Sequence, residues 1–210
     1  FSAWTIYGPE AWSGPSGSVG YAPRSYRRDN EVIVETAADP DAYTRAHYTT
    51  PMDARRMVLL DPHQRELVDG TVETMASIAV PVLDASGEYA GAAGVDVSLA
   101  AIQKVAQSVR LFDTGSSTLV TEHGLIVAHR ESNQLGRKIA DLEGEDTLRL
   151  IDASIEWTQT VTQATVSPIS GESVFRVYAP VQIPRLRSSW VLIASVPEEA
   201  IFGVPRQLTT

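Results

Sequence analysis

Hydrophobic and polar residues alternate along two neighbouring stretches of the chain, 71–82 and 89–97. A period of two is typical of strands, and the turn residues 84–87 between them predict an antiparallel hairpin. After this hairpin the apolar spacing changes to three and four positions, which predicts a helix from Leu99 with Ser98 as its N-cap. The apolar stripe of that helix comprises Leu99, Ile102, Val105 or Ala106, and Val109.

The first forty residues have a different pattern. Gly, Pro and Ser crowd residues 14–20 and predict a long surface loop. The β-branched run Glu31–Glu35 predicts one short strand after this loop. In the second half the alternation returns, and it predicts strands at 117–121, 125–129, 158–166, 174–181 and 190–196, followed by a helix from Pro197.

The two halves of the chain match each other without a gap at a separation of 99 residues. At this separation Pro81 falls on Pro180, and Ile102 falls on Ile201. A strand–turn–strand–helix unit that recurs at a fixed separation indicates a structural repeat. The sequence therefore predicts an α+β fold of two related modules in tandem, with their boundary within residues 110–116.

The charge balance narrows the range of functions. The 210 residues include 17 Lys and Arg against 26 Asp and Glu, a formal net charge of −9. Nucleic acids and anionic membranes bind basic surfaces, so neither is an expected partner. Cys is absent, which excludes a disulfide framework and a thiolate site. No apolar stretch has the length that spans a bilayer, and the start at Phe1 predicts a fragment of a longer protein.

One position breaks the symmetry of the repeat. Asp96, in the strand Gly94–Val97, corresponds to Ser195 in the second half. A carboxylate among Ala, Gly and Val needs a partner, because an unpaired buried charge is costly. Two interpretations are open. The side chain faces a pocket and receives a ligand ammonium, or it caps the following helix or meets solvent at the end of the strand.

A second group of polar residues lies earlier in the chain. Arg45, His47 and Tyr48 are close together, and Asp61 and His63 follow. Arg can pair with a carboxylate through two N–H groups, and aromatic faces accept cations, so this mixture can recognise a small zwitterion. The alternative is a polar loop in which Tyr48 is a half-buried anchor.

Motifs of the common enzyme classes are absent. The sequence contains no nucleophile elbow, no P-loop and no dinucleotide-binding motif. His123 and His129 bracket a turn without a third ligand at zinc spacing. The acidic residues 141–146 do not alternate as a calcium loop requires, and they precede a helix expected at 147–153, whose N-terminus favours acidic side chains. No cofactor and no metal are therefore expected.

Several segments of the chain resemble the double-Cache (dCache) sensor domains of bacterial methyl-accepting chemotaxis receptors and sensor kinases. That family has a Pro-Val strand, a Gly turn, a Gly-Val-Asp strand, and upstream motifs of the form Tyr-Tyr-x-x-Pro, Glu-Pro-Tyr and Val-Asp-Gly. The corresponding segments here are residues 77–82, 84–87, 91–99, 48–51, 60–63 and 68–70. Residues 9–14, 122–129 and 190–192 are similar to further segments of the family, so the likeness covers nearly the whole chain.

The resemblance implies two tandem, PAS-like Cache modules, each an antiparallel sheet flanked by helices. It assigns residues 1–109 to the membrane-distal, ligand-binding module and residues 110–210 to the membrane-proximal module. In the family a long N-terminal helix precedes both modules, and this chain lacks it.

The resemblance also implies roles for individual residues. Family members that bind amino acids carry an Arg-x-Trp-Tyr motif and a strand Asp, which correspond to Arg45, Tyr48 and Asp96 here. His47 stands in the place of the Trp, and His63 stands in the place of the Tyr of Glu-Pro-Tyr.

Together these observations predict a non-enzymatic, extracytoplasmic ligand-sensing domain, periplasmic or on the cell surface, of a membrane-anchored and homodimeric signalling receptor such as a chemotaxis receptor. The expected ligand is a small organic molecule such as an amino acid or amine, with a carboxylate as the alternative. Two other classes are open: a small hydrolase that uses a His with Asp or Ser, and a structural or protein-binding ectodomain. The candidate ligand-binding residues are Tyr26, Arg45, His47, Tyr48, Asp61, His63 and Asp96.

Overall fold

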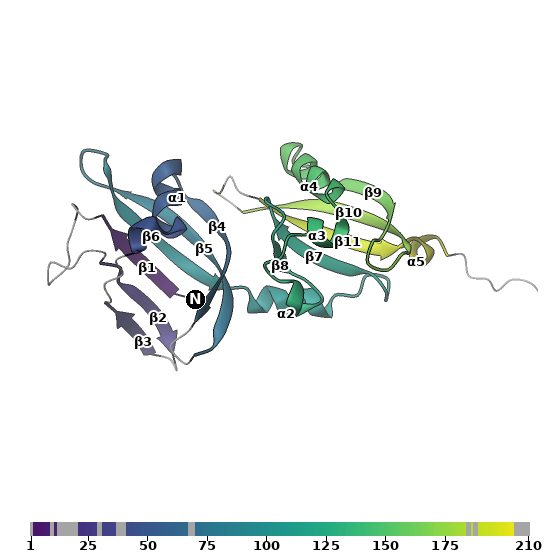
Figure 1. Cartoon of the computed structure of the whole chain (residues 1–210), viewed down its shortest axis with the longest axis horizontal. Helices are drawn as coiled ribbons and strands as arrows, with labels where there is room; N and C mark the ends of the chain where they lie inside the picture. The colour runs from purple at the N-terminus through teal and green to yellow at the C-terminus, as the bar shows by residue number, and fades with distance from the viewer. Residues whose placement is uncertain are drawn as a thin grey trace, which may run out of the picture. The chain divides into compact units, whose positions relative to one another are not determined.

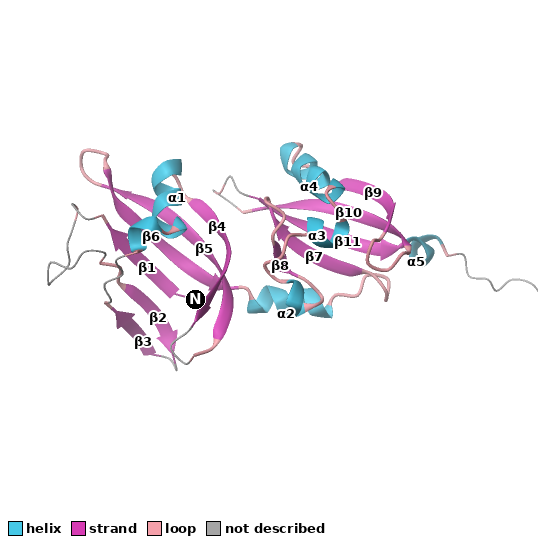
Figure 2. Ribbon diagram, in the orientation of Figure 1, coloured by secondary structure: helices cyan, strands magenta, loops and turns pink. Residues whose placement is uncertain are grey.

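Two compact units make up the described part of the chain, and they divide between Ser98 and Leu99. Each unit contains one antiparallel sheet (Figure 1, Figure 2). This arrangement confirms the predicted α+β fold of two modules. No helix in the described part is long and apolar enough to cross a membrane. The computed structural model describes residues 2–8, 11, 21–28, 31–36, 41–66, 70–183, 186 and 189–203.

The first unit is a six-stranded antiparallel sheet in the order β3-β2-β1-β6-β5-β4. Its strands are β1 (Ser2–Tyr7), β2 (Arg24–Arg28), β3 (Glu31–Glu35), β4 (Val58–Glu66), β5 (Val72–Leu83) and β6 (Tyr89–Ser98). The helices η1 (Ala42–Thr44) and α1 (Ala46–Ala54) pack on one face of this sheet (Figure 1). Buried side chains between them form the core, comprising Trp4, Ile6, Ala42, Tyr48, Val58, Leu60, Ala79 and Ala92.

The second unit is a five-stranded antiparallel sheet in the order β8-β7-β11-β10-β9. Its strands are β7 (Ser116–Thr121), β8 (Ile126–Ala128), β9 (Val161–Val166), β10 (Ser173–Gln182) and β11 (Ser189–Pro197). The helices are α2 (Ala100–Ser108), η2 (Ser132–Gln134), α3 (Ala140–Glu143), α4 (Asp146–Glu156) and α5 (Glu198–Phe202). Ile151 of α4 and Tyr178 of β10 are fully buried in its core.

The two units share one hairpin register. Pro81 of β5 pairs with Ala92 of β6, and Pro180 of β10 pairs with Val191 of β11. The eight pairs from Met75 with Ser98 to Val82 with Gly91 all land on pairs of the second hairpin after the separation of 99 residues, and the ninth pair, Leu83 with Tyr89, lies beyond a register shift and does not. In both sheets an earlier strand, β1 or β7, then pairs with the second strand of the hairpin. The predicted repeat is therefore confirmed at the level of individual strand pairs.

Helix α2 belongs with the second unit. The side-chain amide of Gln103 donates to the backbone oxygen of His129 at 2.8 Å, and the backbone N–H of His129 donates to Gln103 Oε1 at 3.0 Å. This reciprocal pair holds α2 against the sheet that follows it. The first compact unit consequently ends at Ser98, whereas the sequence assigned the helix to a first module ending at residue 109.

Two local expectations differ from the structure, and a third is not tested by it. Ser98 is the last residue of β6, and the N-cap of α2 is Leu99, which makes no side-chain capping bond. Residues 2–7 and 24–28 form β1 and β2, although no alternation was recognised in that loop-rich part of the sequence. The loop expected at 14–20 lies outside the described residues.

Candidate functional site

A buried carboxylate lies at the centre of the first sheet. Asp96 on β6 pairs with Ser2 on β1 and with Ser77 on β5. Side chains of directly paired residues point to the same face of a sheet, so the carboxylate lies between two hydroxyls. Asp96 is only 1% exposed. This position excludes the interpretation in which Asp96 caps a helix or meets solvent at a strand end.

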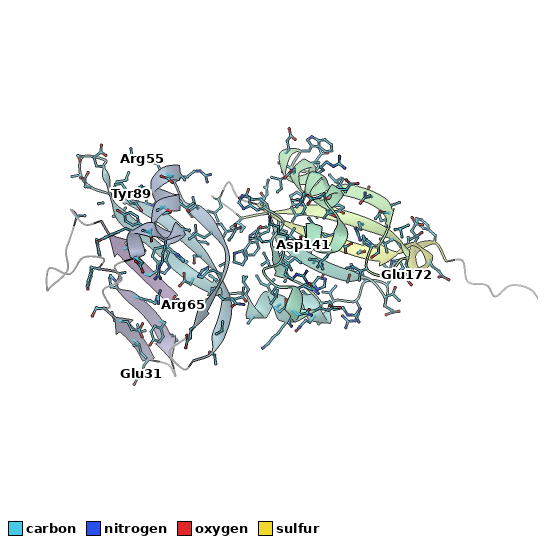
Figure 3. The ribbon with its side chains drawn as sticks, in the orientation of Figure 1. Glu31, Arg55, Arg65, Tyr89, Asp141 and Glu172 are labelled. Carbon is cyan, nitrogen blue, oxygen red and sulfur yellow. The ribbon has the colours of Figure 1, made fainter. Side chains whose placement is uncertain are left out.

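A bulge in β4 brings two further side chains to this face. Leu60 pairs with Ser77, but the next pair is His63 with Met75, so the register shifts by one residue between them. One extra residue in a strand reverses the facing of all residues beyond it, because the side chains alternate. The bulge therefore turns His63 and Arg65 toward Asp96, and the Arg65 side chain is labelled in Figure 3.

Both oxygens of Asp96 are fully used by protein donors. Oδ1 accepts from the indole Nε1 of Trp4 at 2.7 Å and from the hydroxyl of Ser77 at 2.7 Å. Oδ2 accepts from the hydroxyl of Ser2 at 2.8 Å and from Nη1 of Arg65 at 2.5 Å. An ionised carboxylate has about four acceptor positions, so these donors fill it. Trp4 reaches the carboxylate because Gly94 lies opposite it, and a Cβ there would come within 2.4 Å of the indole.

The electrostatics keep Asp96 ionised. Burial raises the pKa of Asp96, but hydrogen bonds from Ser77, Ser2 and Trp4, together with the charge of Arg65, lower it below the ordinary value. The Arg65 guanidinium is itself largely buried, with 14% of its side chain exposed. The pair is therefore a neutral unit, in which Arg65 occupies the position that the sequence assigned to a ligand ammonium.

His47 on α1 covers this cluster. Its Nε2 lies 3.1 Å from Ser77 Oγ, and its ring meets Trp4 and His63 edge to face, with centroids 5.2 and 4.9 Å apart. The single proton of the Ser77 hydroxyl goes to Asp96, so Nε2–H of His47 donates to Ser77 Oγ, and Nδ1 carries the lone pair. Burial, followed by the nearby His63, lowers the pKa of His47 to about 4, so the ring is neutral at pH 7.

A small cavity next to His47 is lined by cations. Its volume is about 60 Å³, and Arg24, Arg45 and His47 line it together with apolar side chains of the core. Arg24 pairs with Trp4 across β1 and β2, so both side chains point into the same face. Among the described residues, Arg24 Nε is the one buried side-chain polar atom that has no hydrogen-bond partner. Burial, followed by the charge of Arg65, lowers the pKa of Arg24.

His47, His63 and Asp96 are also a geometrically possible set of metal ligands. One ligand atom from each lies within 4.8 Å of the others. A divalent cation there would compete with Arg65 for an Asp96 whose acceptor positions are filled. It would also meet the positive charges of Arg24 and Arg45, which already act on His47. The arrangement thus favours an anion beside His47 over a metal ion.

The remaining predicted residues lie apart from this cluster. Tyr48 is 8% exposed and packs edge to face against Tyr43 and Tyr89, with ring centroids 5.1 Å apart in each pair. It is the core anchor that the alternative interpretation described. Tyr26 donates to Glu35 at 2.8 Å, and Asp61 is exposed at the bulge of β4. The structure therefore joins Arg45, His47, His63 and Asp96 into one site, and leaves Tyr48, Tyr26 and Asp61 at its margins.

Five residues of the site were not identified from the sequence. Trp4 and Ser2 lie on a strand whose pattern was not recognised, and Arg24 lies in the basic run after the predicted loop. The direction of the Arg65 side chain depends on the bulge in β4, which the sequence does not reveal. Ser77 cannot be distinguished from other strand residues without its pairing with Asp96. The missing signal is strand pairing, which no single segment of the sequence contains.

Comparisons with known proteins agree with this architecture. A family model, dCache_1, described as a Cache domain, matches residues 20–204. The methyl-accepting chemotaxis protein PctB of Pseudomonas aeruginosa is 25% identical over 78% of this chain. The match covers 27% of PctB, so the chain spans about a quarter of the length of that curated relative.

Solved structures have the same fold. The extracellular domain assigned to the histidine kinase mmHK1S-Z3 is 25% identical, with a TM-score of 0.76 over 100% of this chain and 77% of that one. The ligand-binding domain of PctB from Pseudomonas aeruginosa PAO1, solved in complex with L-Arg, is 19% identical, with a TM-score of 0.60 over 98% of this chain and 74% of that one.

Proposed function

Since the chain belongs to the Cache domain family, in its dCache form, we propose that it is the extracytoplasmic sensor domain of a membrane-anchored signalling receptor and that its first unit binds a small organic carboxylate. Sensor domains of this kind in chemotaxis receptors and kinases bind ligands and do not catalyse reactions. The relatives include the chemotaxis receptor PctB, whose domain binds L-Arg. The receptor's output and its assembly as a homodimer are part of the same proposal.

The choice of a carboxylate rests on one observation. Arg24 Nε is buried without a partner at the wall of a cavity that Arg45 and His47 also line. A buried donor without an acceptor is costly, and a ligand carboxylate would supply that acceptor. An ammonium group would face the positive charges of Arg24 and Arg45, and it would find Asp96 already paired with Arg65. The cavity of about 60 Å³ has room for a carboxylate head group.

The geometry argues against a hydrolase that uses Ser77, His47 and Asp96. In such a triad the His removes the proton of the Ser, and the Asp orients the His. Here Ser77 donates its proton directly to Asp96, and Ser77 is 0% exposed. The hydroxyl is therefore committed to the carboxylate and closed to a substrate.

The test uses three probes of the same shape and different charge. We expect butyrate to raise the melting temperature of the chain and to bind in isothermal titration, while butyramide and butylamine bind weakly or not at all. Arg24→Gln should weaken butyrate binding by about 10- to 100-fold, since a hydrogen bond to a charged group contributes about 1.5–3 kcal/mol. Arg27→Gln is the matched control, because Arg27 is on the same strand but exposed.

Two results would contradict the proposal. If butylamine bound and butyrate did not, the site would take an amine, and Arg65 would have to move away from Asp96. If butyrate bound equally to Arg24→Gln and Arg27→Gln, the carboxylate would lie elsewhere in the chain.

A further inference from the structure

A cavity of the second unit is larger than the small cavity next to His47. Its volume is about 300 Å³, at the lower end of the range of small-molecule sites. The floor is formed by side chains of β7, β10 and β11, and polar residues of η2, α3 and the β9–β10 connection complete the walls. Every lining residue belongs to the second unit.

The floor of this cavity corresponds to the Asp96 cluster of the first unit. There the strand pairs give the row Ser77, Asp96, Ser2, and in the second unit the equivalent row is Arg176, Ser195, Ser116. The carboxylate of Asp96 thus corresponds to the hydroxyl of Ser195, and the hydroxyl of Ser77 corresponds to the guanidinium of Arg176. The same register therefore presents a buried cation in the second unit, where the first presents a buried anion.

The buried cation is only partly used by the protein. Arg176 is 3% exposed, and its Nη2 donates to Oε2 of Glu143 on α3. Within the described residues, neither side chain makes another hydrogen bond. A guanidinium has five N–H donors, so Arg176 keeps donors that face the cavity. Asp96, in contrast, has no acceptor position left.

We propose that this cavity is a second ligand site, and that it binds a compact zwitterion between Arg176 and Glu143. The ligand carboxylate accepts from the guanidinium and from the hydroxyls of Ser116 and Ser195, and the ligand ammonium donates to Glu143. An ion pair beside a polar cavity matches a molecule that carries both charges close together. Arg176 then contacts the ligand carboxylate in place of Glu143, and Glu143 contacts the ligand ammonium in place of Arg176, so neither side chain is left without an opposite charge.

A simple anion or cation fits less well. An anion at Arg176 would be repelled by Glu143, and a cation at Glu143 would be repelled by Arg176. The other charged side chains of the lining, Arg130, Glu131 and Glu172, are of both signs (Glu172 is labelled in Figure 3). The lining therefore offers partners of both signs to a ligand that carries both charges.

The experiment compares a zwitterion with its two halves, on the whole chain. L-Alanine carries both charges, propionate lacks the ammonium, and ethylamine lacks the carboxylate. In isothermal titration of the Arg24→Gln chain, which lacks the carboxylate site proposed for the first unit, we expect L-alanine to bind at least about tenfold more tightly than either fragment. Its side chain is one methyl group, so a cavity of this size has no steric reason to reject it.

Four variants locate the site. Arg176→Met and Glu143→Gln should each weaken L-alanine binding by about 10- to 100-fold. Arg149→Met, which removes an exposed ion pair with Asp146 in the same unit, should leave it unchanged. Arg24→Gln should also leave it unchanged, which separates this site from the carboxylate site of the first unit. Circular dichroism and the melting temperature confirm that each variant is folded.

The inference would be overturned in any of three ways. L-Alanine could fail to bind, or it could bind Arg176→Met as well as the parent chain. Alternatively, Glu143→Gln could strengthen the binding of propionate and L-alanine alike, which would show a plain anion site. The Glu143→Gln variant keeps Arg176, so the test holds even if Arg176→Met does not fold.

Discussion

Replacement of Asp96 by Asn should destabilise the first unit strongly. The amide keeps the shape of the side chain but removes its charge, and it places an N–H₂ group among four donors. Whichever way the amide turns, it faces either Ser2 and Arg65 or Trp4 and Ser77 with a donor instead of an acceptor. At least one hydrogen bond is lost, because the indole of Trp4 and the guanidinium of Arg65 cannot accept from the amide, and Arg65 loses its counter-charge in a largely buried position.

The magnitude follows from the burial of this pair. Removing one partner of a buried ion pair typically costs about 3–5 kcal/mol, because the other charge stays buried and unpaired. For a unit of this size, 1 kcal/mol corresponds to a shift of about 4–8 °C in melting temperature, so we expect a decrease of at least about 12 °C. Asp84→Asn is the matched control, since that carboxylate lies in an exposed turn, and its effect should be much smaller.

The assay is urea unfolding at pH 7, followed by the indole N–H signals of the tryptophans in NMR spectra. Trp4 reports on the first unit, and Trp190, on β11, serves as an internal reference in the second. Asp96→Asn should move the Trp4 transition to lower urea concentration and leave the Trp190 transition in place. Equal stability of the variant and the parent chain at Trp4 would refute the argument that Asp96 organises this sheet.

Two further predictions concern the same cluster. The folded-state pKa of His47, about 4, lies below the unfolded value of about 6.5, so the unfolded chain binds the proton first, and stability falls as the pH drops from 6.5 toward 4. His47→Gln should reduce the loss of stability between pH 7.5 and pH 5 by about 1–2 kcal/mol, measured by urea titration at both pH values; an unchanged loss would show that His47 is not the group responsible. Gly94→Ala should destabilise the first unit by roughly 1–3 kcal/mol and shift the Trp4 indole signal, because the new methyl group would lie 2.4 Å from that ring and 2.6 Å from the oxygen of Ile78. A Trp4 signal that does not move would contradict this steric explanation.

The sequence predicted the repeated hairpins correctly because their register is local. Residues 71–82 and 89–97 alternate cleanly and are joined by a short turn, so pairing follows from the pattern itself. The same pattern recurs 99 residues later, so it predicts the same register for β10 and β11. Strand β1 was missed because both its partners, β2 and β6, are distant in the sequence. Strand β2 also pairs with the neighbouring β3, but its sequence, Arg24–Arg28, is mostly polar and shows no apolar alternation.

The site was predicted in part for the same reason. Asp96 was predicted as a site residue because a carboxylate is unusual in an apolar strand, and the structure places it at the centre of the cluster. Its partner Arg65 could not be found, because the facing of β4 changes at a bulge that the amino-acid pattern does not reveal. A ligand ammonium was expected at Asp96 because the sequence did not reveal that Arg65 supplies the cation.

The bulge in β4 also has a consequence for how such domains diverge. The loss of one codon between Leu60 and His63 would turn His63 and Arg65 outward without any substitution, and the charge of Asp96 would then need a cation from elsewhere. If the first unit binds a carboxylate as proposed, strand length would thus help to determine which ligand charge the domain accepts. Relatives that retain the aspartate but differ here by a single insertion or deletion would be candidates for opposite ligand preferences, which a column-by-column comparison of residue identities would overlook.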